Sequence, residues 1–211
     1  MTLQCIYSNN GEIAYWDEIR KMVILPDNTE YSLVCGAPNT LSFVPSLTEF
    51  KNHTYLACDM YNNRLLLIKK DFIKPFGPVL NAPYSITHAK GLIYVATYPD
   101  GIIEPAVIAI LDDTGNYYGQ LYLDRHVAKK QQNLLYSKDP DVQRKDTEKP
   151  KPVKLAVKSI STDSNNIIIS YTNGETKSFD AIHPENAMLS SIGFRYVLHS
   201  SRSVRTKKSM F

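Results

Sequence analysis

Short apolar runs separated by turn-forming residues dominate the pattern of the chain. Tyr55 and Ala57 lie two residues apart and therefore share one face of a predicted strand, and Tyr94 and Ala96 do the same. The turn cluster at 61–64 and the apolar run at 65–68 follow the first of these strands. This order predicts a β-hairpin, and short antiparallel strands are therefore the expected building unit.

The same pattern continues along the chain. A predicted strand at 107–111 leads into the turn-forming segment 112–116 and then into a strand at 117–123. Asn173 and Gly174 form a dipeptide that favours a tight hairpin, here between the apolar run that ends at Tyr171 and a strand at 177–179. Fourteen tyrosines are a further sign of strands.

The strands belong to an internal repeat. Residues 45–57 return as 83–96, 38 to 39 positions later, and fainter copies lie at 11–25 and 160–171. Repeats of about 40 residues made of short strands are typical of β-propeller blades, and 211 residues correspond to about four to five of them. We predict an all-β, small or incomplete β-propeller, either a closed four-bladed ring or an open ring that closes against a partner.

One copy of the repeat resembles a known family. Residues 55–65 read Tyr-Leu-Ala-Cys-Asp-Met-Tyr-Asn-Asn-Arg-Leu, and Phe76-Gly77, Pro83 and the strand 93–96 follow. This pattern resembles the NHL-repeat branch of the β-propellers, most clearly over residues 36–97. The second copy departs from it, because Thr97 stands where the aspartate is expected and the Asn-Arg hairpin is missing.

The resemblance implies blades of four antiparallel strands and no particular reaction. We interpret Asp59 and Arg64 as fasteners of the hairpin or of neighbouring blades, with a role as ligands as the alternative.

Charge divides the chain into two halves. Residues 1–124 carry a balance of −5 and residues 125–211 a balance of +8, within a total of +3. We therefore divide the chain into propeller-like blades at 1–124, an inserted polar arm at 125–154, a further β blade at 155–199 and a basic C-terminal tail at 200–211. The arm is rich in Lys, Gln, Asp and Pro and poor in large apolar residues, so it cannot bury a core of its own.

The basic arm and tail are the predicted partner-binding segments. The residues proposed to make these contacts are Lys129, Lys130, Arg144, Lys145, Arg202, Arg205, Lys207 and Lys208. The expected partners are other protein subunits of an assembly, with an oligomer of this chain among them. Any contact with nucleic acid is expected to be weak and electrostatic, because no recognised binding module is present.

Targeting and redox features are few. No apolar span of 18 residues occurs, and residues 1–8 lack the pattern of a signal peptide, so we expect an unsecreted protein of the cytoplasm or of a virion, without membrane contact. Cys5, Cys35 and Cys58 are odd in number and widely spaced, and we predict that they are small buried hydrophobic residues in a reducing compartment.

Catalytic and metal-binding patterns are also sparse. The five histidines lie in separate segments, and the turn at 112–116 lacks the remainder of a calcium loop. No catalytic residue, cofactor or metal is therefore predicted. We expect a non-enzymatic structural or protein-interaction component of a larger assembly, such as a virus or phage particle. A metal-dependent NHL-like hydrolase or lyase is the first alternative, and a nucleic-acid-binding accessory protein is the second.

Overall fold

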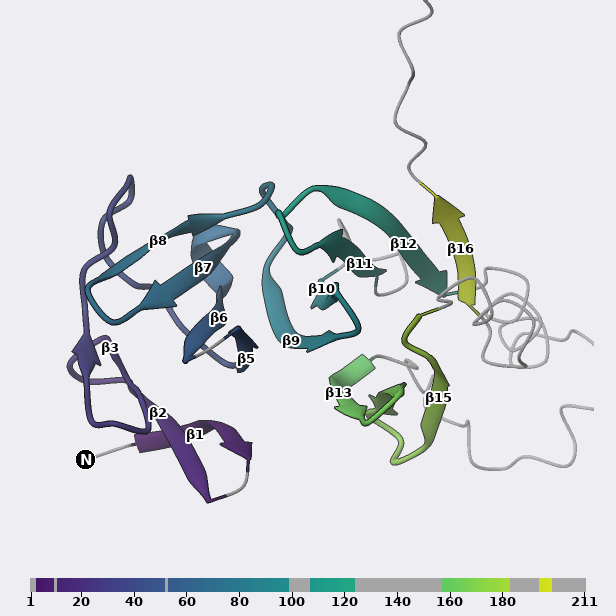
Figure 1. Cartoon of the computed structure of the whole chain (residues 1–211), viewed down its shortest axis with the longest axis horizontal. Coiled ribbons are helices and arrows are strands. Elements are labelled where there is room, and N and C mark those ends of the chain that lie inside the picture. The colour runs from purple at the N-terminus through teal and green to yellow at the C-terminus, as the bar shows by residue number, and fades with distance from the viewer. Residues whose placement is uncertain are drawn as a thin grey trace, which may run out of the picture.

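The structure is a computed structural model that describes residues 3–9, 11–51, 53–98, 107–123 and 157–182, together with the backbone of 194–198. Its elements are strands apart from one short 3-10 helix, η1 (Met60–Asn62). The strands form four antiparallel sheets that follow one another along the chain. Figure 1 shows these sheets placed one after another around a common centre.

Each sheet is one blade. The first blade consists of β1 (Leu3–Asn9), β2 (Glu12–Asp17), β3 (Met22–Ile24) and β4 (Glu30–Tyr31). The second consists of β5 (Leu47–Lys51), β6 (Thr54–Asp59), β7 (Arg64–Lys69) and β8 (Phe72–Phe76). The third consists of β9 (Pro83–Ala89), β10 (Leu92–Thr97), β11 (Val107–Asp112) and β12 (Tyr117–Leu123). The fourth consists of β13 (Val157–Asp163), β14 (Asn166–Tyr171) and β15 (Thr176–Asp180).

The chain is a four-bladed β-propeller, which confirms the predicted fold class. Two departures from regularity lie near its end. The fourth blade has three strands among the described residues, and β16 (Phe194–Leu198) pairs with β12 at the outer edge of the third blade. The strand that follows the fourth blade in sequence therefore extends its neighbour.

Three apolar clusters join successive blades face to face. The first cluster joins blades one and two around Trp16 and Tyr55, the second joins blades two and three around Leu65 and Ile93, and the third joins blades three and four around Tyr94. Removal of these faces from water is the main driving force for stacking one blade on the next. The core of this protein is therefore divided among the blade interfaces.

The interface between the fourth blade and the first is different. Among the described residues, no comparable apolar cluster joins these two blades. The face of the first blade that turns away from the second carries Ile13 and Tyr15 on β2, with Cys5 and Ile24 paired beside Tyr15, and Ile13 and Cys5 are exposed. The ring is thus held by three strong interfaces, and its fourth junction has no packed core of its own in the described part of the chain.

The structure fixes the register of the repeat at 38 residues in the second strands and at 39 in the inner strands, where Ser85 corresponds to Ser46. Tyr55 packs toward the first blade, whereas Tyr94 packs toward the fourth, so these two tyrosines are not equivalent positions. A spacing of 38 places Tyr55 opposite Ile93, and both of these face the preceding blade. A shift of one residue in a strand reverses the face of every side chain, which is why the two spacings lead to different cores.

Tyr94 tests this packing. Its side chain is 0 % exposed, its ring lies edge-on to that of Phe179 with centroids 5.8 Å apart, and its hydroxyl donates a hydrogen bond of 2.7 Å to the carbonyl oxygen of Ala181. We expect Tyr94→Ala to lower the free energy of unfolding by about 3 kcal/mol, because it leaves a cavity between the third and fourth blades. Tyr94→Phe is the matched control and should cost about 1 kcal/mol, since it removes only the hydrogen bond.

Urea denaturation measures both variants. A loss below about 0.5 kcal/mol for Tyr94→Ala would contradict the buried position, because surface substitutions stay within that range.

Candidate functional site: the central channel and its two mouths

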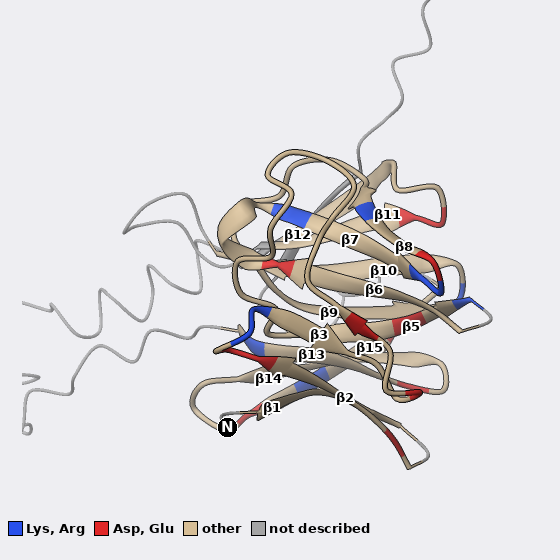
Figure 2. Cartoon of the chain, turned by 90° about the vertical axis from the view of Figure 1, so that its left-hand side faces the viewer, with Lys and Arg blue, Asp and Glu red and all other residues tan. Residues whose placement is uncertain are grey.

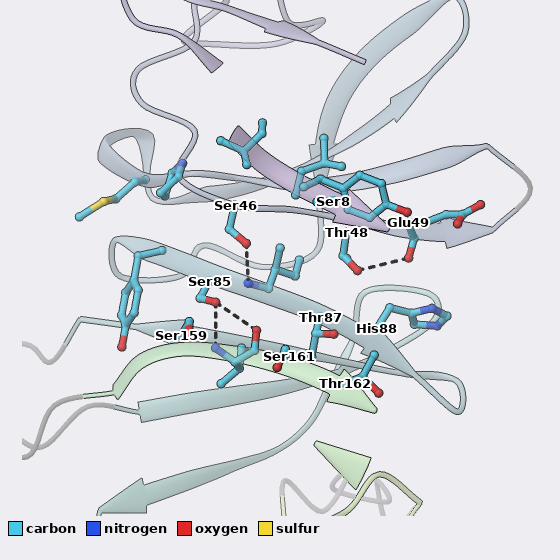
Figure 3. Close-up of a pocket in the computed structure, with 18 of the residues that line it drawn as sticks. Ser8, Ser46, Thr48, Glu49, Ser85, Thr87, His88, Ser159, Ser161 and Thr162 are labelled. Carbon is cyan, nitrogen blue, oxygen red and sulfur yellow. Dashed lines mark hydrogen bonds between the residues drawn. The ribbon is translucent and has the colours of Figure 1, made fainter. Parts of the chain in front are cut away.

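The innermost strands of the four blades line a channel. Residues of β1, β5, β9 and β13 line a cavity of about 1040 Å³. Hydroxyl side chains come from all four strands and dominate its wall, as the labelled residues of Figure 3 show: Ser8, Ser46, Thr48, Ser85, Thr87, Ser159, Ser161 and Thr162. A wall of this kind donates and accepts hydrogen bonds and carries no charge of its own.

Two of these serines connect neighbouring blades. The Ser46 hydroxyl accepts a hydrogen bond of 3.2 Å from the Ile86 N–H, across the second and third blades. The Ser85 hydroxyl accepts one of 3.0 Å from the Ile160 N–H, across the third and fourth blades (Figure 3). Inner strands lack a ladder partner on the channel side, so a serine that pairs with the next strand satisfies one of the free N–H groups.

The same geometry is absent at the fourth junction. Ser159 precedes Ile160 just as Ser85 precedes Ile86, yet no hydrogen bond of the Ser159 hydroxyl to β1 is present within the described ranges. Serine contacts are therefore present at the junctions between blades two and three and between blades three and four, where apolar clusters also lie. Within the described residues, neither kind of contact joins the fourth blade to the first.

One mouth of the channel is aromatic. Phe43 and Tyr61 form a stacked pair with ring centroids 5.9 Å apart, and Tyr84 and Tyr98 form a tilted pair with centroids 4.8 Å apart. All four residues line the channel. Tyr61 and Tyr98 are 68 % and 51 % exposed, so each pair presents one ring to solvent.

The chain places the two pairs at the same end of adjacent blades. Phe43 and Tyr84 lie just before, or at the start of, the inner strands β5 and β9. Tyr61 and Tyr98 follow the second strands, β6 and β10, which return to the same end of the channel because they run antiparallel to the inner strands. Both aromatic pairs therefore lie at one mouth of the channel.

Hydrogen bonds hold this mouth in shape. The Tyr84 hydroxyl donates 2.7 Å to the Val157 carbonyl oxygen, and burial raises its pKa well above the ordinary value, so the phenol keeps its proton. The Tyr98 N–H donates to the Asn81 carbonyl oxygen at 3.2 Å, and the Asn81 side-chain amide donates back to the Tyr98 carbonyl oxygen at 2.8 Å. The ring of Tyr84 and the backbone of Tyr98 are consequently held in place before any ligand arrives.

The opposite mouth carries charges. Asp113 accepts a bond of 2.7 Å from the Lys51 ammonium and lies 3.1 Å from Nε2 of His88. The His88 ring packs edge-on to Phe50 with centroids 4.9 Å apart. Glu49, on the neighbouring inner strand β5, lies at the same end of the channel (Figure 3). The two ends of the channel therefore differ in chemistry, one being aromatic and the other ionic.

The NHL-like hairpin has a structural role. Asp59 is buried and accepts 2.8 Å from Nε of Arg64, which is itself buried. The other Asp59 oxygen accepts 2.9 Å from the Ser42 N–H, and Nη2 of Arg64 donates 3.2 Å to the Thr40 carbonyl oxygen. These contacts tie the hairpin to the segment that enters β5, as expected for a fastener of the fold.

The predicted partner-binding residues lie outside the described residues. These residues are Lys129, Lys130, Arg144, Lys145, Arg202, Arg205, Lys207 and Lys208. The whole of the predicted arm, 125–154, and of the predicted tail, 200–211, also lies outside the described residues. Figure 2 shows that the basic and acidic positions of the described ribbon are interspersed, with neither sign gathered on one region. The predicted contacts of the arm and tail stay predictions.

One prediction about the cysteines is wrong. Cys58 is buried, and burial raises its pKa, but Cys5 and Cys35 are exposed free thiols. Cys5 lies on the face of the first blade that none of the described blades covers, and Cys35 lies between β4 and β5, outside the regular strands. Small apolar residues are buried only where a neighbouring face packs on them, and at these two positions none does.

The described residues contain no group of three or more His, Cys, Asp or Glu side chains arranged to hold a metal ion. None of their helices is both long and apolar enough to cross a membrane. His53 is exposed between β5 and β6, far in sequence from the His88 site. The sequence analysis missed the four aromatic residues of the mouth, because they do not recur at the spacing of the strands and only the fold brings them to one end of the channel.

Comparison with known proteins gives likeness in shape alone. No protein-family model matches the chain, and no curated protein matches it. Among solved structures, it is similar to the computationally designed Ika4 protein, with 12 % identity, a TM-score of 0.44, and coverage of 85 % of this chain and 91 % of that one.

Two further structures share this level of similarity. The computationally designed Ika8 protein has 10 % identity, a TM-score of 0.45, and coverage of 85 % of this chain and 46 % of that one. Virginiamycin B lyase from Staphylococcus aureus has 15 % identity, a TM-score of 0.44, and coverage of 85 % and 55 %. The chain thus spans about half the length of these two, and none of the three carries an argument about function.

Removal of a serine contact should weaken the ring. We expect Ser85→Ala to lower the free energy of unfolding by about 2 kcal/mol, because the buried Ile160 N–H loses its acceptor. Ser161→Ala is the matched control, since Ser161 is an exposed serine on the adjacent strand and should change stability by less than about 0.5 kcal/mol. Equal effects of the two substitutions in chemical denaturation would contradict the role of Ser85.

The ionic mouth predicts a dependence of stability on pH. Burial alone would raise the Asp113 pKa, but hydrogen bonds from Lys51 and His88 outweigh burial and lower it. A carboxylate whose folded-state pKa is depressed stabilises the fold above its unfolded pKa of about 3.9, and this stabilisation is lost as the pH falls through the folded value. We therefore expect the urea midpoint of Asp113→Asn to fall less steeply than that of the native chain on acidification below about pH 4.

Asp71→Asn is the matched control, because Asp71 lies in the exposed turn between β7 and β8. Parallel acid profiles for the native chain and Asp113→Asn would contradict this prediction.

Proposed function

We propose that this protein is a non-enzymatic binding component of a larger assembly and that the aromatic mouth of the channel is its contact with another protein. The observation that supports this most is the pair of exposed tyrosines, Tyr61 and Tyr98, each set on a second ring at one end of a rigid propeller. Rigid aromatic side chains with a polar tip supply large contact areas at low entropic cost.

The chemistry of the mouth agrees with that of protein interfaces. Interface centres are enriched in Tyr, Trp, Phe and Met and depleted of charged residues. Met60 joins the four rings at this end of the channel, and Lys158 is the charged side chain that lines the same end. Tyrosine is also among the residues that most often dominate binding energy.

Neither alternative function has an observation of this strength. A metal-dependent hydrolase or lyase would be favoured by His, Asp or Glu side chains gathered at one mouth, and no such metal-holding group occurs within the described ranges. A nucleic-acid-binding accessory protein would be favoured by a continuous basic face, which the described ribbon does not have (Figure 2). Both alternatives would have to rely on residues beyond the described ones.

The setting of the assembly is likewise a proposal. A virus or phage particle remains the predicted setting. Contacts of the basic arm and tail with other subunits of the assembly also remain predictions. A relationship to NHL-repeat propellers is supported by the Asp59–Arg64 hairpin and by the spacing of 38 to 39 residues between the second and third blades. Oligomerisation of this chain is an expectation that the weak fourth junction makes attractive.

The tyrosines provide the test. In cells that naturally carry this chain, we expect Tyr61→Ala and Tyr98→Ala to shift the protein from the high-mass assembly fraction to the free fraction, each at a cost of about 2 kcal/mol in binding. The share of the chain in each fraction after sedimentation is the measurement. The fold should be unaffected, because both side chains are exposed.

Tyr118→Ala is the matched control, since Tyr118 is an exposed tyrosine on the outer strand β12, away from the channel lining. Normal assembly of both channel variants would refute the proposed function. A loss that the Tyr118 variant shares would assign the effect to general surface change and would also count against the aromatic mouth.

A further inference from the structure

We propose that the aromatic mouth binds a proline-rich segment of the partner protein in the polyproline II conformation. This inference rests on the proposed function and names the chemistry of the partner. It is carried by the arrangement of the two ring pairs, by the free hydroxyls on their exposed members and by the occupied backbone groups around them.

The two ring pairs belong to neighbouring blades and line one cavity. Phe43 and Tyr61 form one wall on the second blade, and Tyr84 and Tyr98 form the other on the third blade. The space between them belongs to the same cavity, because all four residues line it. Slots between aromatic rings are the surfaces on which the ridges of a polyproline II helix dock.

The exposed rings also offer hydrogen-bond donors. The Tyr84 hydroxyl is already used by the Val157 carbonyl oxygen. The Tyr61 and Tyr98 hydroxyls have no hydrogen bond to any described residue, so they can donate to a ligand. Prolines present carbonyl oxygens without N–H groups, and a donor that projects from an aromatic wall matches such a chain of acceptors.

Other modes of peptide recognition fit this mouth less well. Addition of a strand would require free backbone groups at the start of the inner strands, but the Ser46 carbonyl oxygen accepts from the Cys58 N–H and the Ile86 N–H donates to the Ser46 hydroxyl. An amphipathic helix needs a long apolar groove, whereas the channel behind the rings is lined with serine and threonine. A neutral, extended, proline-rich ligand suits both the rings and the polar wall behind them.

Both sides of the contact are preorganised. Phe43 is held edge-on against the buried ring of Trp16, with centroids 6.3 Å apart. The backbone of Tyr98 is held by its two bonds with Asn81, and its ring contacts that of Tyr84. A proline-rich segment has little conformational freedom to lose on binding. A small contact between two stiff surfaces can therefore yield measurable affinity.

The experiment uses the full chain and a defined probe. Acetylated decaproline amide is titrated into the protein, and binding is followed by isothermal titration calorimetry and by tyrosine fluorescence, with a glycine-serine peptide of equal length as the control ligand. We expect saturable binding of decaproline at micromolar to low millimolar concentration and none of the glycine-serine peptide.

Variants assign the site. Tyr61→Ala and Tyr98→Ala should each weaken decaproline binding at least tenfold, while Tyr118→Ala on β12 should bind as the native chain does. Tyr61→Phe and Tyr98→Phe retain the ring and lose the donor, and we expect each to weaken binding about fivefold, in line with one neutral hydrogen bond. A loss of affinity smaller than that of the alanine variants would distinguish the contribution of the hydroxyl hydrogen bond from that of the ring contact.

The outcomes separate this inference from the proposed function. Absence of decaproline binding, or binding that the alanine variants leave unchanged, would overturn the polyproline inference. If decaproline does not bind but the same alanine variants are lost from the natural assembly, the mouth is a protein contact with a different ligand chemistry, and the proposed function stands. If they bind decaproline weakly but assemble normally, the site recognises proline-rich chains and the proposed function fails.

Discussion

Burial of one blade face against the next is the constraint on which this structure depends. No single sheet of three or four strands encloses a core, so the apolar face of each blade is covered by its neighbour. Ser46 and Ser85 add a polar contact to the same interfaces at the channel wall. Stability is therefore distributed along the chain in steps, and the channel exists because the inner strands cannot approach one another more closely than these interfaces allow.

The sequence was sufficient for the local elements. Alternation around Tyr55 and Tyr94, the apolar run of β7 and the turn at 112–116 each predicted a strand or hairpin that the structure contains. The Asp112 side chain accepts hydrogen bonds from the Thr114 and Asn116 N–H groups, which explains why that turn is encoded locally. Strands and tight turns depend on neighbours in sequence, so a single chain reveals them.

The arrangement between blades could not be obtained in the same way. In the second strands, a spacing of 39 residues would put Tyr55 and Tyr94 on equivalent faces, whereas the actual spacing of 38 puts them on opposite ones. The apolar pattern of the sequence does not distinguish the two spacings. The burial of Cys58 and the exposure of Cys5 also follow from which blade has a neighbour on that side. The aromatic mouth depends on residues about 40 positions apart, and it became visible once two blades were set side by side.

The distribution of charge and exposure separates folding from binding in this molecule. The ion pair of Asp59 and Arg64 and the serine contacts are largely withdrawn from solvent, so they act on the fold. Tyr61 and Tyr98 contribute exposed area that the fold does not need, yet backbone bonds and ring contacts keep them in place. Solvent-exposed aromatic area that is held rigid costs little entropy when a partner covers it, and that combination distinguishes a binding surface from incidental apolar exposure.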